Sequence, residues 1–199
     1  MGPRVTEPAP TKPLLLTPAD RLELVRAIHD SPVLIVLAIA GGGNAAITDL
    51  LDVPGASRTI LEIRVPYAAT AMADLLAVDD DEPWSTTRPE DPNGGSANGA
   101  VSESTARTMA EACLRRARHL APDATDLLGV ACTAALVSDR PKKGDHRAHV
   151  AVAHLDDTAA GVSHEVRVDL EKGALDRAGE DRVVADAILR EIGHACHLR

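Results

Sequence analysis

Two segments of the sequence carry residue types that suit the binding of an anion. The first is Gly41-Gly42-Gly43-Asn44, which follows an apolar run and precedes a predicted helix. Glycines let a backbone approach a ligand closely, and the free amides at the start of a helix favour negative charge. The spacing matches neither a Walker loop nor the dinucleotide pattern GxGxxG. The loop therefore fits either a phosphate site or a tight turn that needs positive φ.

The second segment is 138–147, SDRPKKGDHR, a basic stretch in a chain with a formal net charge of -9. Its cations are Arg140, Lys142, Lys143 and Arg147. A guanidinium can bind a phosphate through two parallel hydrogen bonds, and lysines add positive potential. Proline and glycine within the stretch indicate a loop between strands, where binding residues are often displayed. The alternative is a solvated turn whose own aspartates pair with its lysines.

Three more residues could take part in catalysis beside such a phosphate site. His146 lies in the basic segment, and the ordinary histidine pKa of about 6.5 allows both protonation states near neutrality. Thr133 stands at the end of a predicted strand, and it or a bound water would be the nucleophile. Tyr67, the only tyrosine, follows a strand and could either position a ligand or cap the sheet edge.

The histidines offer little for a metal centre. His194 and His197 lie close together near the C-terminus, but the sequence has no second cluster with the spacing of zinc ligands. We therefore expect no metal and no cofactor. His149, His154 and His164 lie on predicted strands and could be adjacent across a hairpin; we interpret them as surface residues.

The hydrophobic pattern predicts one α/β domain with three layers, α/β/α, around a mixed sheet. An apolar run, PVLIVLAIA, reads as a central strand buried on both faces. The predicted strands are 32–40, 59–67, 127–133, 148–155 and 162–170, the last two forming a hairpin. The predicted helices are 18–29, a short helix after Asn44, 70–77, 102–119 (capped by Ser102, with Met109, Cys113 and Leu120 facing inward) and 179–196.

Composition limits the class of partner. Residues 1–16 read as a flexible proline-rich tail, 17–199 as the domain, and 79–98 as a mobile acidic loop within it. Net negative charge argues against a general affinity for nucleic acid or anionic membrane, and a 1% aromatic content argues against stacking on bases. With three scattered cysteines and no long apolar run, we expect a cytoplasmic protein. The expected partner is a small phosphorylated ligand, and both a monomer and a homo-oligomer stay open.

The order of short motifs resembles the CinA C-terminal domain, whose active members are nicotinamide-mononucleotide deamidases. The stretch 52–57, DVPGAS, is similar to the family's D-V-P-G-S-S, and 99–103, GAVSE, matches G-A-V-S-E. Weaker matches are 65–67, VPY, with V-A-Y, and 75–78, LLAV, with L-L-G-V. The resemblance runs from about residue 33 to the C-terminal helix and implies the same three-layer fold.

The same register implies that two reactive residues are replaced. The family's S-C-T-G-G falls on 40–44, so that its serine is Ala40, and its Y-S-N-E-A-K keeps Tyr67 but has Met72 in place of the lysine. A methyl group cannot attack a carboxamide, and a thioether cannot transfer a proton. The resemblance thus implies a divergent domain that binds a phosphorylated nucleotide such as a pyridine mononucleotide. The alternatives are an amidohydrolase that uses other groups, and a protein-interaction domain that uses the acidic loop.

Overall fold

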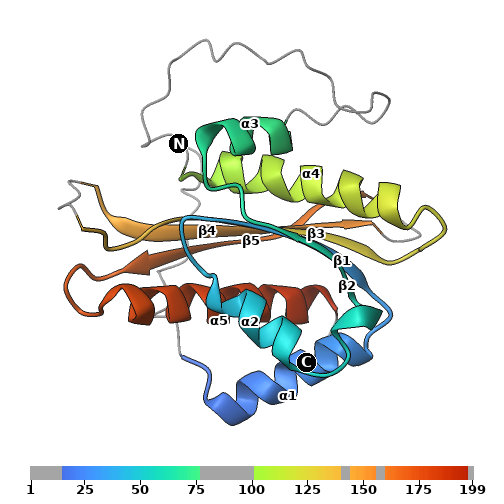
Figure 1. Cartoon of the computed structure of the whole chain (residues 1–199), viewed down its shortest axis with the longest axis horizontal. Helices are drawn as coiled ribbons and strands as arrows, with labels where there is room; N and C mark the ends of the chain where they lie inside the picture. Colours follow the sequence, from blue (N-terminus) through green and yellow to red (C-terminus); the bar gives the residue numbers. More distant parts are fainter. Residues whose placement is uncertain (1–14, 77–100, 140–143, 156–159, 197–199) are drawn as a thin grey trace, which may run out of the picture.

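A computed structural model describes residues 15–76, 101–139, 144–155 and 160–196. The acidic loop, nearly all of the proline-rich tail, and Arg140, Lys142 and Lys143 lie outside these residues. The rest forms one five-stranded sheet between two layers of helices, which confirms the predicted α/β/α fold (Figure 1).

The sheet is mixed, as predicted. Its strands are β1 (Leu34–Ala40), β2 (Ile60–Arg64), β3 (Leu127–Ala135), β4 (His146–Leu155) and β5 (Ala160–Leu170). Their order across the sheet is β2-β1-β3-β4-β5. β1 runs parallel to β2 and β3, whereas β4 is antiparallel to both β3 and β5. The ends of β1 and β3 and the start of β4 therefore meet at one end of the sheet.

The helices divide between the two faces of the sheet (Figure 1). The first face, here called the α5 face, is covered by α1 (Pro18–Asp30), α2 (Ala45–Asp52) and α5 (Arg177–Ala195). The opposite face, here called the α4 face, is covered by α3 (Ala69–Leu76) and α4 (Glu103–Leu120). Each face has its own cluster of buried apolar side chains.

The α4 face is packed with small residues, which brings α4 unusually close to β3. A Cβ at Gly129 of β3 would lie 2.1 Å from the carbonyl oxygen of Ala110 and 2.2 Å from the amide nitrogen of Leu114, both on α4. Only glycine fits at this contact, because real Cβ atoms do not approach backbone so closely. A core of alanine, valine, leucine and isoleucine can therefore be dense without phenylalanine.

Side chains cap the starts of α1 and α4, and the cap of α4 is the predicted Ser102. Thr17 accepts a hydrogen bond from the Asp20 amide at 3.1 Å, and Ser102 accepts one from the Thr105 amide at 3.2 Å. Asn44 precedes α2, but its side chain makes no capping bond. Leu120, predicted to face inward with Met109 and Cys113, is 39% exposed, because it lies in the last turn of α4 beyond the sheet contact.

Candidate functional site

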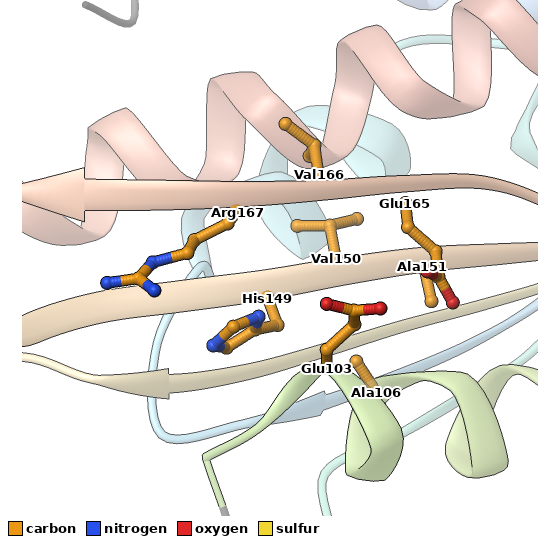
Figure 2. A pocket seen from close by; sticks show the side chains of 8 residues that line it. All are labelled: Glu103, Ala106, His149, Val150, Ala151, Glu165, Val166 and Arg167. Carbon is orange, nitrogen blue, oxygen red and sulfur yellow. The ribbon is translucent and has the colours of Figure 1, made fainter. Parts of the chain in front are cut away.

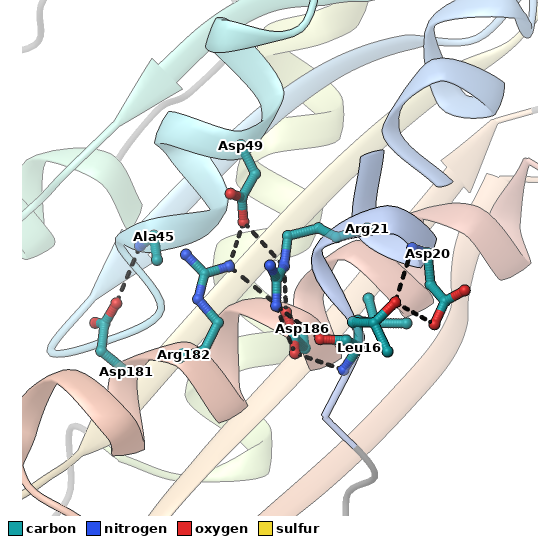
Figure 3. Close-up of polar contacts among 9 residues, drawn as sticks. Leu16, Asp20, Arg21, Ala45, Asp49, Asp181, Arg182 and Asp186 are labelled. Atoms are coloured by element: carbon teal, nitrogen blue, oxygen red, sulfur yellow. Dashed lines mark hydrogen bonds and ion pairs between the residues drawn. The ribbon is translucent and has the colours of Figure 1, made fainter. Parts of the chain in front are cut away.

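The loop at Gly41–Asn44 does hold an anion, and that anion is a carboxylate of the chain itself. Asp181 of α5 accepts hydrogen bonds from the amides of Gly43 at 2.7 Å, Asn44 at 3.1 Å and Ala45 at 3.0 Å. Figure 3 shows the contact with Ala45. The first amides of a helix have no partner within the helix, which is why the start of α2 attracts negative charge. A phosphate could bind here only by displacing Asp181.

The glycines of this loop are also required by the fold alone. Gly41 and Gly43 have φ of +87° and +90°, in the left-handed region that favours glycine. A Cβ at Gly41 would lie 2.0 Å from the carbonyl oxygen of Ala134, and one at Gly42 would lie 2.3 Å from a methyl of Leu136. The loop thus has the properties of the tight turn that the sequence left open as an alternative.

Ion pairs around this loop join α5 to α1 and α2 (Figure 3). Arg21 of α1 donates to Asp186 of α5 at 2.8 Å, and this hydrogen bond raises the pKa of the guanidinium. The Asp186 side chain is buried and also accepts from the Leu16 amide at 2.9 Å. Arg182 of α5 pairs with Asp49 of α2. These charges are engaged with one another, so they serve to fix three helices on the α5 face.

His146, the predicted proton carrier, is buried on the α5 face beside a carboxylate. Its Nδ1 lies 2.6 Å from Oε1 of Glu180, which is itself fully buried. The other oxygen of Glu180 accepts from the Val137 amide at 2.7 Å. Glu180 therefore holds Val137, which follows β3, and His146, the first residue of β4.

Thr133 and Tyr67 do not share a site with His146, so the predicted catalytic group is divided. Thr133 is buried on β3. Its neighbours in the strand, Cys132 and Ala134, both pack on the α5 face. Because side chains alternate along a strand, Thr133 points to the α4 face, with the sheet between it and His146. Tyr67 is 79% exposed after β2.

The strand register places a different histidine next to Thr133. Thr133 pairs with Ala40 of β1 on one side and with His149 of β4 on the other. His149 in turn pairs with Arg167 of β5. Paired residues in neighbouring strands point to the same face. Ala40, Thr133, His149 and Arg167 therefore form one row across the α4 face.

A cavity of about 170 Å³ lies at the His149–Arg167 end of this row, between the start of α4 and strands β4 and β5 (Figure 2). His149 is 7% exposed, and none of the hydrogen bonds in the described part of the chain involves its ring. Among the described residues, Arg115 Nε is the one fully buried side-chain nitrogen or oxygen without a partner. The ring nitrogens of His149 are therefore accessible from the cavity. The lining residues are Glu103, Ala106, His149, Val150, Ala151, Glu165, Val166 and Arg167.

Burial and nearby positive charge favour the neutral form of the His149 ring. Burial lowers the pKa of His149, and the guanidiniums of Arg167 and Arg147 lower it further. Arg147, the predicted phosphate ligand nearest to the site, points to the α4 face and donates to the Val101 carbonyl at 3.2 Å. The neutral ring can accept a hydrogen bond from a ligand or a proton from a nucleophile.

The carboxylates of the cavity are largely neutralised by Arg107 of α4. This guanidinium binds Glu165 through two hydrogen bonds of 2.6 and 2.8 Å and lies 3.5 Å from Glu103. The same pair lowers the pKa of Glu165. Arg167, which also lines the cavity, pairs with Asp169 at 2.7 Å, so the charged groups of the cavity wall are largely paired with one another.

The resemblance implies that Ala40 and Met72 replace two reactive residues of the family, and both side chains lie in apolar surroundings. Ala40 and Met72 both pack against the buried cluster of the α4 face. Ala40 is the direct neighbour of Thr133 in the ladder. The cavity and these two positions thus belong to the same face of the sheet.

The arrangement defines a single α/β/α domain with a small polar cavity over a mixed sheet. Within the described ranges, no group of three or more histidine, cysteine, aspartate or glutamate side chains is placed to hold a metal ion. No helix in the described part of the chain is long and apolar enough to cross a membrane.

Solved structures of CinA-type proteins share this fold. The competence/damage inducible protein CihA from Agrobacterium tumefaciens is 22% identical, with a TM-score of 0.62 over 92% of this chain and 99% of that chain. A CinA superfamily protein from Escherichia coli is 18% identical, with a TM-score of 0.58 over 91% of this chain and 94% of that one. One from Enterobacter cloacae is 15% identical, with a TM-score of 0.60 over 98% and 99%.

No family model matches the sequence, and no curated protein matches it. The structural similarity therefore confirms the predicted resemblance as one of fold, over nearly the full chain.

Proposed function

We propose that the chain binds a small phosphorylated ligand, such as a pyridine mononucleotide, on the α4 face and lacks the deamidase groups of the CinA family. The observation that carries the proposal is His149, which is buried beside a cavity, is influenced by the charges of Arg147 and Arg167, and makes no hydrogen bond through its ring to any described residue. Buried polar groups almost always have a partner, and a ligand in the cavity would supply one.

Charge and size favour a phosphate or a ring at this position. Arg147 can donate two parallel hydrogen bonds to phosphate oxygens, and Arg167 can donate with the N–H groups that do not contact Asp169. Since a water molecule takes about 30 Å³, a cavity of about 170 Å³ holds a small group rather than a whole nucleotide. The remainder of the ligand would lie outside the cavity.

The absence of deamidation follows from the replaced groups. Hydrolysis of a carboxamide needs a nucleophile, a proton carrier and donors for the oxyanion. Ala40 and Met72 supply neither of the first two, and the amides of Gly43 and Asn44 already bind Asp181. Binding without turnover is the expected result.

A second candidate, an amidohydrolase that uses other groups, is favoured by the pairing of Thr133 with His149. In it, Thr133 Oγ attacks the carboxamide carbon while His149 accepts the hydroxyl proton. His149 then passes that proton to the departing ammonia, and water hydrolyses the resulting ester. His149 takes the place that the sequence analysis gave to His146.

Calorimetric titration with nicotinamide mononucleotide, beside an assay for released ammonia, tests both candidates. We expect saturable binding, no ammonia, and binding weaker by about 10-fold or more in Arg147→Met, since a charge-assisted hydrogen bond contributes about 1.5–3 kcal/mol. Arg26→Met removes an exposed guanidinium of α1 and should bind as the wild type does. Equal loss in both variants, or no binding of either the nucleotide or inorganic phosphate, would reject the proposal. Ammonia release that is lost in Thr133→Val and His149→Gln would establish the second candidate.

A further inference from the structure

The two glutamates of the cavity wall are not engaged equally. Glu165 uses both of its carboxylate oxygens in hydrogen bonds to Arg107, at 2.6 and 2.8 Å, whereas the contact between Arg107 and Glu103 is longer, 3.5 Å. The carboxyl group of Glu103 also lies next to that of Glu165, where like charges repel each other. Because two carboxylates share one guanidinium, Glu103 has acceptor capacity left for a hydrogen-bond donor of a ligand.

Glu103 and His149 reach the cavity from different elements. Figure 2 shows the carboxylate of Glu103, at the start of α4, and the ring of His149, on β4, facing the same space. A neutral imidazole offers one N–H donor and one acceptor nitrogen, whereas a carboxylate offers acceptors alone. A group that combines an NH₂ donor with a neighbouring acceptor, such as a carboxamide, therefore matches both side chains at once.

The phosphate of such a ligand has a separate place. Arg147 lies two residues before His149 on the same face of β4, roughly 7 Å away along the strand. It is not part of the cavity wall, and a cavity of about 170 Å³ holds only a small group. A ring would thus lie in the cavity toward Glu103, while the phosphate would lie outside it at Arg147.

We propose that Glu103 is a specificity-determining residue of this site, which selects a ligand whose flat ring carries an NH₂ group over one that carries a carboxylate or carbonyl there. The inference rests on the proposed function and adds which part of the ligand enters the cavity. Glu103 accepts a hydrogen bond from the NH₂ group. It disfavours an oxygen in the same place, because two acceptors facing each other leave both without a donor, and two carboxylates also repel.

Glu103 has a structural role as well, and the two roles predict different results. It lies in the first turn of α4, where the helix dipole favours negative charge, and four residues before Arg107. A structural role alone predicts that Glu103→Gln lowers stability and changes the affinity for every ligand by a similar factor. Selection by Glu103 predicts a change in the ratio of two affinities.

Calorimetric titration with two pairs of nucleotides tests this selection. Nicotinamide and nicotinate mononucleotides differ by a carboxamide against a carboxylate, and cytidine and uridine monophosphates by an amine against a carbonyl. In the pair that fits the cavity, we expect the wild type to bind the NH₂-bearing member about 10-fold more tightly or better, as for other charge-assisted hydrogen bonds. In Glu103→Gln the ratio should fall to about threefold or less, because glutamine can also donate to an oxygen. Glu23→Gln removes an exposed carboxylate of α1 and should keep the wild-type ratio.

Inorganic phosphate is the third probe, and it separates failure of this inference from failure of the proposed function. Equal affinities within both pairs, or binding of phosphate without any of the four nucleotides, would overturn the role of Glu103 and leave a phosphate site in place. A wild-type preference that persists in Glu103→Gln, shown to be folded by far-UV circular dichroism, would also overturn it. If neither phosphate nor a nucleotide binds, the proposed function fails and this inference fails with it.

Discussion

Removal of the Asp181 carboxylate is the sharpest test of how the glycine loop is stabilised. Asp181→Ala leaves the amides of Gly43, Asn44 and Ala45 without their acceptor. Loss of a helix cap costs about 0.5–2 kcal/mol, and a buried donor left unpaired costs about 1–3 kcal/mol. Gly43 is buried whereas Asn44 is exposed and can bond to water. We therefore expect a loss of about 2 kcal/mol in the free energy of unfolding, or roughly 4–8 °C in Tm for a chain of this size.

Urea and thermal unfolding measure this loss, with Asp123→Ala, an exposed carboxylate after α4, as the control. Asp181→Asn keeps one oxygen acceptor and should be intermediate. Inorganic phosphate should then stabilise Asp181→Ala more than the wild type, because an emptied anion site gains a ligand that binds only the folded state. If Asp181→Ala unfolds within about 0.5 kcal/mol of the control, the carboxylate does not hold the loop and the reasoning fails.

Other predictions concern titration and packing. The NMR titration midpoint of His149 should lie below 6.5, and a midpoint at or above it would contradict the burial and charge assigned to this ring. Because Arg107 lowers the pKa of Glu165, the pair stabilises the fold above pH 4.5 and loses that effect as the pH falls through the folded-state value. The stability difference between wild type and Arg107→Met in urea should therefore shrink below pH 4.5; a constant difference would show that the charge of Glu165 is immaterial. Gly129→Ala should cost about 3 kcal/mol or more by overpacking against α4, whereas Gly144→Ala, whose Cβ meets nothing within 4 Å, should be neutral in the same thermal assay.

The fold could be predicted because its elements carry strong local signals. The run that forms β1 is apolar throughout and ends at glycines, and Thr17 and Ser102 mark the starts of α1 and α4. The spacing of apolar residues shows which side of a helix or strand is buried, and this spacing can be read from the sequence alone. The mixed sheet then followed from one hairpin added to alternating helices and strands.

The site could not be predicted as well, because it depends on register between strands. His146 and His149 are three residues apart on β4, so they point to opposite faces of the sheet. The sequence predicts His146 in a loop, where the orientation of its side chain carries no such restriction. Only the pairing of Thr133 with His149 shows which histidine can act beside the threonine. Alternation along the strand, counted back from the buried Val150, predicts the face to which each histidine points. It does not predict that Thr133 lies next to His149.

The two faces of the sheet differ in how their buried polar groups are paired, and this difference favours the α4 face as the place for a ligand. On the α5 face the buried Glu180 and Asp186 each have hydrogen-bond partners within the chain, and Asp181 fills the anion site that a phosphate would need. A ligand there would have to break contacts that hold α5 in place. On the α4 face the ring of His149 makes no such bond within the part of the chain that the structure describes. Binding at His149 gains a hydrogen bond without sacrificing one, so the lower cost of binding lies on that face.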